Sequence, residues 1–219
     1  MNQLDRQDFA SVLMIALIAG CVDATGFLQL GGFFVSFMSG NSTRLGLGLG
    51  SAMWREAGLA LGLVATFVGG VTFGNLVGVH LPRHRRQALL VLDGILLGLA
   101  AACHQYGLAA GATVPMVLAM GMANTIFKGG AGVRFGVTYM TGALVKIGEH
   151  IAASAHGGSR SAVLPYAALW LSLVVGATLG ARGYIAIGGR LLWIPAIAMV
   201  LLGLVHALMA RQRHRAVGA

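Results

Sequence analysis

The chain has 219 residues, of which 57% are hydrophobic and 10% are charged, and its mean hydropathy is +0.82. Soluble domains carry about 25% charged residues, so the composition excludes a soluble globular protein and predicts an all-α membrane protein with one membrane domain, residues 1–219. The net charge of +9 does not indicate nucleic-acid binding, because Arg and Lys lie mostly in short connections between apolar runs. Cys21 and Cys103 lack the spacing of a metal site or a disulfide, so we expect no metal and no cofactor.

Six apolar stretches approach the length of about 20 residues that a spanning helix needs. In chain order they are Phe9–Leu30, Ala57–Leu81, Ala88–Leu108, Val114–Phe127, Ala162–Tyr184 and Leu191–Met209, and the fourth is short. Two further apolar pieces, Phe33–Met53 and Phe135–Ala155, are interrupted by glycine and small polar residues. Each interrupted piece either crosses the membrane or re-enters it and leaves on the side where it entered.

The two interrupted pieces share a motif. VSFMSGNSTRLG (Val35–Gly46) and VTYMTGALVKIG (Val137–Gly148) lie 102 residues apart, and seven of the twelve aligned pairs are identical or exchange Ser for Thr or Phe for Tyr. VGGVTFG (Val68–Gly74) resembles VVGATLG (Val174–Gly180) at an offset of 106. Two blocks that recur in the same order predict two repeats, residues 9–110 and 114–210.

Positive charge favours re-entry over eight full crossings. With six spans, eleven Arg and Lys residues lie on the cytoplasmic side and four outside, whereas eight spans remove almost all of this bias. Because each repeat then contributes three crossings, the second is inverted relative to the first. We therefore expect six transmembrane helices in a 3+3 inverted-topology repeat, with a broken or re-entrant segment in each half and both termini cytoplasmic.

The broken segments are the predicted functional site. Backbone that leaves a helix at membrane depth survives only inside protein or beside a water-filled cavity. We expect helices to begin near Asn41 and Ala143, capped by Ser39, Asn41 and Thr141, so that two positive helix ends approach the midplane from opposite sides. Capped kinks that serve only packing are the alternative.

Charged side chains near the motifs are further candidates, because ionisable residues inside a membrane are usually functional. Arg44 and Lys146 occupy matched positions, although Arg44 also fits a side chain that snorkels outward and Lys146 a pair with Glu149. Asp23 fits a proton or sodium relay, a counter-ion for Arg44, or a protonated hydrogen-bonding residue. Weaker candidates, expected to form hydrogen bonds between helices, are Asp93, Asn75 and His206, with Asn124 near the position that matches Asp23. The predicted substrate-binding or pore residues are Asp23, Met38, Ser39, Gly40, Asn41, Arg44, Asn124, Met140, Thr141, Gly142 and Lys146.

Three segments carry a family resemblance. DATGFLQLGGFFVSFMSGN (Asp23–Asn41), GMANTIFK (Gly121–Lys128) and VTYMTG (Val137–Gly142) resemble the YoaK-like family of bacterial multi-pass inner-membrane proteins. The resemblance covers essentially the whole chain, implies location in the bacterial inner membrane and suggests small-molecule transport, without supplying a substrate. Arg44 departs from the family, which tends to have an apolar or small polar residue there.

These observations predict a transporter or channel for a small polar or anionic solute, passive or proton-coupled, with its site at the midplane between the broken segments. A structural or assembly factor for another membrane protein is the alternative. A membrane enzyme built on Ser39 and His206 is less favoured, because the sequence offers only two residues far apart, and we expect no enzymatic activity. The expected partners are a small-molecule or ion solute and membrane lipids, not nucleic acid, and homo-oligomers are allowed.

Overall fold

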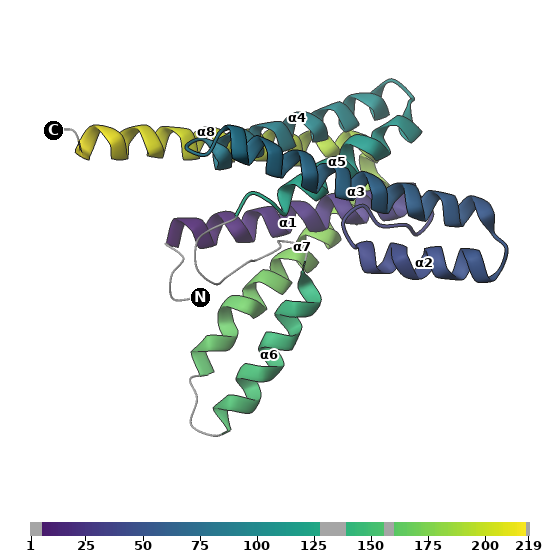
Figure 1. The fold of residues 1–219 in the computed structure, drawn as a ribbon, viewed down its shortest axis with the longest axis horizontal. Coiled ribbons are helices and arrows are strands. Elements are labelled where there is room, and N and C mark those ends of the chain that lie inside the picture. Colours follow the sequence, from purple (N-terminus) through teal and green to yellow (C-terminus); the bar gives the residue numbers. More distant parts are fainter. Residues whose placement is uncertain (1–5, 128–138, 156–159, 218–219) are drawn as a thin grey trace.

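The computed structural model describes residues 6–127, 139–155 and 160–217, and these residues form helices joined by turns (Figure 1). The α-helices are α1 (Arg6–Gln29), α2 (Met38–Gly50), α3 (Trp54–His80), α4 (Arg85–Gln105), α5 (Thr113–Ala123), α6 (Met140–Ser154), α7 (Leu164–Ile187) and α8 (Trp193–Val217). Three short 3-10 helices lie between them: η1 (Ala109–Ala112), η2 (Arg160–Val163) and η3 (Gly188–Leu192). The predicted all-α fold is confirmed for the described residues.

Four stretches are long and apolar enough to cross a membrane: Asp8–Gln29, Trp54–His80, Arg85–Gln105 and Ser161–Ala210. The last of these includes both α7 and α8. Ala109–Ala123 is apolar but shorter, because α5 ends at Ala123 and the chain turns through Asn124–Phe127, where the sequence predicted continued helix. Large apolar side chains on outward faces, such as Leu61, Val68 and Val79 of α3, are exposed. Such faces are stable against lipid rather than water.

The helices pack as interleaved pairs. α1 packs along α7, α3 along α5, and α4 along α8. α2 turns at Ser51–Met53 and packs back on α3, and α6 lies beside α7 (Figure 1). The core between these pairs is apolar and includes Ile15, Leu97 and Met120. Helices of the first half therefore pack mainly on helices of the second.

Glycines allow two of these pairs to approach closely. A Cβ atom added at Gly176 of α7 would lie 1.9 Å from the carbonyl oxygen of Leu17, and one at Gly180 would lie 2.4 Å from that of Cys21. Helix backbones come this near only where small residues face each other. The α1–α7 pair therefore depends on these glycines.

The same contacts recur at matched positions in the α3–α5 pair. Gly70, which precedes Gly176 by 106 residues, faces the carbonyl of Leu118 at 2.3 Å from an added Cβ. The partner helix of each pair also contributes a glycine: Gly20 of α1 faces the Leu173 carbonyl of α7, and Gly121 of α5 faces the Phe67 carbonyl of α3. The two blocks that repeat in the sequence are thus the two blocks that form these contacts.

The connection from α1 to α2 folds back along α1. Gly31 and Gly32 have φ of +63° and +98°, values that glycine adopts readily and other residues rarely. After this reversal, Val35 lies against Gly26 of α1 and binds Asp23. Since Asp23 precedes the end of α1 by six residues, the chain returns about 9 Å along the helix before α2 begins.

α2 and α6 are shorter than the spanning helices. With 13 and 15 residues, they extend about 20 and 22 Å at 1.5 Å per residue. The hydrocarbon core of a bilayer is about 30 Å thick. Neither helix crosses that distance alone.

Candidate functional site

Two side chains satisfy the non-helical backbone before α2. The Asp23 carboxylate oxygen Oδ1 accepts hydrogen bonds from the backbone N–H groups of Val35 and Ser36, both at 2.8 Å. The fully buried Asn41 side chain accepts from the N–H of Phe34 at 3.0 Å and donates to its carbonyl at 2.7 Å. Unsatisfied backbone groups are costly at membrane depth. Asp23 and Asn41 therefore hold this segment in shape.

The helices begin earlier than the sequence predicted. α2 begins at Met38 and α6 at Met140, with Phe37 and Tyr139 as N-caps and no side-chain cap hydrogen bond at either. The prediction that Ser39, Asn41 and Thr141 cap helices starting near Asn41 and Ala143 is wrong, because these residues lie inside the first turns. The Asn41 amide instead reaches back to Phe34. Both helix N-termini thus keep their first N–H groups without side-chain caps.

A cavity of about 310 Å³ lies where the two helices begin. Its walls come from the start of α2, one face of α3, the turn after α5 and the start of α6. Its lining residues are Ser36, Phe37, Met38, Ser39, Phe67, Val71, Asn75, Asn124, Thr125, Tyr139, Met140 and Thr141. We call it the motif cavity.

The motif cavity brings matched residues of the two motifs together. Phe37 and Tyr139, Met38 and Met140, and Ser39 and Thr141 all line it, and the members of each pair lie 102 residues apart. Of the predicted site residues, Met38, Ser39, Asn124, Met140 and Thr141 contribute directly. Hydroxyl and amide groups make part of the wall polar.

The two glycines of the motifs do not touch each other. A Cβ at Gly40 would meet the rings of Phe37 and Phe34, and one at Gly142 would meet no atom of the described residues within 4 Å. Gly40 and Gly142, although both are predicted site residues, therefore do not meet at the centre of the site, and neither lines the motif cavity. The neighbouring Ser39 and Thr141 face the shared space instead.

Neither Arg44 nor Lys146 is among the described residues that line the motif cavity. The Arg44 guanidinium stacks on the Phe33 ring, 4.6 Å from its centre, and Asp23 binds backbone N–H groups rather than Arg44. Lys146 donates to Glu149 at 2.6 Å on an exposed face. Each cation thus has a local partner. For Lys146 this partner is Glu149, the pairing that the sequence analysis gave as the alternative to a role in the site.

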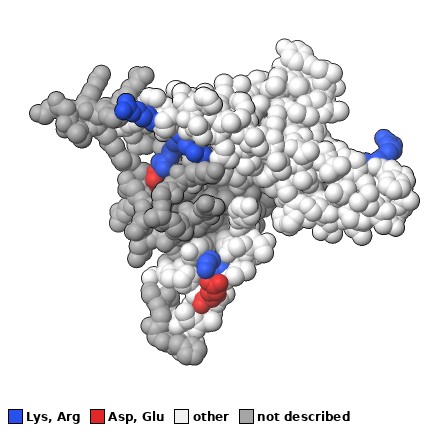
Figure 2. All heavy atoms as spheres, viewed as in Figure 1, with Lys and Arg blue, Asp and Glu red and all other residues white. Residues whose placement is uncertain are grey.

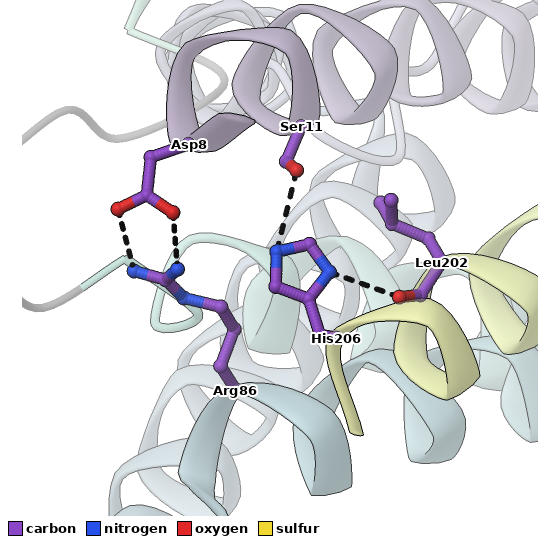
Figure 3. Close-up of polar contacts among 5 residues, drawn as sticks. All are labelled: Asp8, Ser11, Arg86, Leu202 and His206. Carbon is purple, nitrogen blue, oxygen red and sulfur yellow. Dashed lines mark hydrogen bonds and ion pairs between the residues drawn. The ribbon is translucent and has the colours of Figure 1, made fainter. Parts of the chain in front are cut away.

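The histidine of the weaker enzyme hypothesis has another partner. His206 lies in a hydrogen bond of 3.3 Å with Ser11 of α1, not with Ser39, and its Nδ1 donates to the Leu202 carbonyl at 2.9 Å (Figure 3). This pair links α1 to α8, as predicted for interhelical bonding. Asp93 behaves differently, because it is fully buried in α4 and neither carboxylate oxygen has a hydrogen-bond partner in the described structure.

Sequence reasoning missed several wall residues and named Asn75 only as a weaker candidate for hydrogen bonds between helices. Phe67, Val71 and Asn75 follow one another at intervals of four on α3, a spacing that places them on one face. Phe37 and Tyr139 were already visible as an aligned aromatic pair. Thr125 required the fold, because it enters from the turn after α5. Among the described residues no three His, Cys, Asp or Glu side chains come together to hold a metal.

Comparison with known proteins places the chain in a family. The model of DUF1275, a family described as proteins of unknown function, matches residues 11–205. The chain belongs to the DUF1275 family. A UPF0700 transmembrane protein of Rhizobium meliloti (strain 1021) is 34% identical over 193 residues, which cover 88% of this chain and 83% of the relative. No solved structure matches this DUF1275 protein. These matches confirm an uncharacterised family of membrane proteins, and neither description contains the YoaK-like name.

Proposed function

We propose that this DUF1275 protein is a transporter or channel for a small polar or anionic solute, which binds in the motif cavity. The observation that carries the proposal is the lining of this cavity by three matched pairs from the two motifs. Broken helices that meet at a cavity inside the membrane are a recurrent construction of transporters. The volume of about 310 Å³ falls at the small end of ligand-binding pockets.

The packing supports the inverted-repeat topology. The matched contacts of α1 with α7 and of α3 with α5 are those expected of two similar units related by an approximate two-fold axis. In this topology the three long helices of the first half, α7 and α8 cross the membrane. The 11 residues of α5 are too few to cross alone, so the remaining crossing is made by η1, α5 and the turn after α5 together, while α2 and α6 re-enter from opposite faces.

Charge sets the orientation in the bacterial inner membrane. Arg83, Arg85 and Arg86 lie at the α3–α4 turn, and Figure 2 shows Arg and Lys side chains gathered toward that end of the molecule. Only a small group of basic atoms is visible at the opposite end, near the α2–α3 turn. By the positive-inside rule the α3–α4 turn and both termini face the cytoplasm.

The helix ends favour a solute with an electronegative group. α2 and α6 begin at the motif cavity without side-chain caps, and each N-terminus carries roughly half a positive charge. Because Arg44 and Lys146 have local partners, the selectivity for anionic or polar groups comes from the positive potential of the two helix ends and from hydroxyl and amide side chains.

Asp23 is the proposed coupling residue. It binds the N–H of Ser36, which lines the motif cavity, so protonation of Asp23 weakens a bond that holds the cavity wall. We expect Asp23→Asn to fold, because its amide oxygen still accepts these bonds, and to lose the dependence of flux on a proton gradient. Equal gradient dependence in Asp23→Asn and wild type shows that Asp23 does not couple transport.

The main test is flux in liposomes. Purified protein should carry small anions or polar solutes across the bilayer, and Ser39→Leu and Thr141→Leu should each lower flux at least tenfold by filling the cavity from opposite motifs. Gly62→Ala, on α3 with no atom within 4 Å of an added Cβ, is the matched control. Wild-type flux in both leucine variants places the pathway elsewhere and refutes the proposed site.

A structural or assembly role is the second candidate. Gly46 and Gly50 of α2 face open space within the described structure, and small residues on an open helix face suit packing by another transmembrane helix. Under this hypothesis Gly46→Leu disrupts a complex in the native membrane while the motif-cavity variants leave that complex intact.

A further inference from the structure

A second cavity, of about 320 Å³, lies where α3 turns into α4. Its lining residues come from α1, the α3–α4 turn, the first turn of α4, the turn after α5, and α8: Asp8, Pro82, Arg83, Arg85, Arg86, Gln87, Ile126, His206, Met209 and Ala210. We call it the basic cavity. Figure 3 shows three of its walls: Asp8 of α1 and Arg86 of α4 point toward each other, and beside them His206 of α8 points toward Ser11.

The described wall of this cavity has an excess of positive charge. Three guanidinium groups line it, against one carboxylate. Arg86 uses that carboxylate, because its Nη1 and Nη2 atoms donate to the two oxygens of Asp8, the second at 3.2 Å, and it also stacks on the Phe127 ring at 4.8 Å. Arg83 and Arg85 are left without a carboxylate in the described wall.

Arg85 has only neutral acceptors. Its Nη2 atom donates to the Thr125 carbonyl at 2.8 Å and reaches the Asn75 side-chain oxygen at 3.4 Å. Its Nε atom is buried and has no hydrogen-bond acceptor in the described structure. The Nε atom faces Gly78 of α3 rather than the cavity, whereas an anion in the cavity supplies the counter-charge that the Arg85 guanidinium lacks in the described wall.

Two features of the helices favour an anion here: the positive start of α4 and the space that Gly78 leaves for the Arg85 side chain. Arg85 and Arg86 occupy the first turn of α4, where the positive helix end disfavours cations and favours anions. Gly78 of α3 leaves space for the Arg85 head group, because a Cβ there would lie 2.6 Å from its Cζ. The sequence thus places cations where helix electrostatics alone would not, a conflict typical of functional sites.

We propose that the basic cavity binds an anionic group, a phosphate or a carboxylate, between Arg83 and Arg85. His206 adds a polar wall, and its two ring nitrogens are already hydrogen-bonded to the Leu202 carbonyl and to the Ser11 hydroxyl. The anion is either a soluble ion or the head group of an acidic phospholipid, which basic pockets at cytoplasmic membrane faces bind.

Arg85 also connects the two cavities. It lines the basic cavity, and its acceptors Asn75 and Thr125 line the motif cavity. An anion that binds Arg85 competes with the Thr125 carbonyl and draws the guanidinium away from the shared wall. This role as an entrance rests on the proposed function, whereas anion binding itself requires no transport.

Binding is tested on the purified full chain at constant ionic strength. In one arm, inorganic phosphate and acetate are titrated against protein in neutral detergent, with chloride as the reference ion. In the other, native mass spectrometry measures the lipid retained from nanodiscs of phosphatidylcholine with and without phosphatidylglycerol. Saturable phosphate or acetate binding identifies a soluble anion, and selective retention of phosphatidylglycerol identifies a head group. Absence of both overturns the proposal.

The variants locate the site. Arg83→Gln and Arg85→Gln should each weaken binding about tenfold to a hundredfold, the effect of losing one charged hydrogen bond. Gly78→Ala keeps every charge but displaces the Arg85 head group, and should weaken binding as well. Arg55→Gln, at the α2–α3 end, is the matched control. If Arg85→Gln fails to fold, the exposed Arg83 decides the question, and binding by Arg83→Gln equal to that of Arg55→Gln overturns the proposal.

The two proposals fail separately. Anion binding that Arg83→Gln weakens, without flux in liposomes, leaves the site standing and refutes transport. Flux that the motif-cavity variants abolish, without anion or lipid binding, refutes the basic site and leaves transport standing.

Discussion

Gly176→Ala tests the closest helix contact in the protein's described structure. The new Cβ would lie 1.9 Å from the Leu17 carbonyl oxygen, whereas Cβ atoms essentially never approach other atoms to less than 3.0 Å. The obstacle is backbone on a neighbouring helix, so no side-chain rotation relieves it. α1 and α7 must therefore separate by about 1.1 Å at this point.

The separation has a calculable cost. Forcing extra atoms into a packed interface destabilises a protein by about 1–3 kcal/mol, and a radial gap of about 1 Å forfeits up to half of each affected dispersion contact. For a chain of this length, 1 kcal/mol corresponds to a shift of about 2–4 °C in Tm. We therefore expect Gly176→Ala to lower Tm by about 2–12 °C.

The matched variant in the other half should follow the same geometry. At Gly70 the added Cβ would lie 2.3 Å from the Leu118 carbonyl, so a smaller movement suffices and we expect a smaller loss of Tm than for Gly176→Ala. Gly62→Ala has no neighbour within 4 Å and should leave Tm unchanged or raised, because alanine favours helix by about 1 kcal/mol. Thermal unfolding in detergent, followed by fluorescence-detected gel filtration, gives all three values. A Tm for Gly176→Ala equal to that for Gly62→Ala would refute the close packing of α1 on α7.

Three further substitutions test individual side chains, each by Tm in detergent against wild type. Asn41→Leu leaves the N–H and carbonyl of Phe34 unpaired and should destabilise the fold by about 2–4 kcal/mol, so an unchanged Tm contradicts the role given to this amide. Asp23→Ala removes the acceptor of two N–H groups and should cost about 2–4 kcal/mol, with a clearly smaller loss for Asp23→Asn; equal losses would show that the hydrogen bonds are not the cause. Asp93→Val removes a buried carboxyl that has no partner in the described structure and should stabilise by about 1–2 kcal/mol, whereas a loss of stability would reveal a partner.

Composition and charge were sufficient to predict helices in a membrane, because lipid permits few other spanning structures. The paired motifs also indicated which segments lie together, since backbone breaks at membrane depth need a shared polar space. Met38, Ser39, Met140 and Thr141 line one cavity, with Asn124 beside them. This part of the site was predictable from the sequence because the same motif occurs twice, and the comparison of the two copies identifies the shared residues.

The remaining features depend on contacts distant in sequence. Nothing local shows that Asn41 bonds to Phe34 rather than capping a helix, because both uses suit an asparagine near a helix start. The partner of Gly176 is on a helix about 160 residues earlier, so the matched glycine blocks signalled close packing without naming the partner. Arg85 was visible only as a topology signal, and its position between two cavities appeared with the fold.

The interleaving of the two halves also sets the order of events during synthesis. Gly20 of α1 packs on Leu173 of α7, which the ribosome adds 153 residues later, about 8–30 s at cellular elongation rates. During that interval α1 lies in the bilayer with its glycine-lined face covered by lipid or by the insertion machinery. Assembly of this protein is therefore completed only after translation of its last third, and a nascent chain stopped before α7 lacks the main native partner of its first helix.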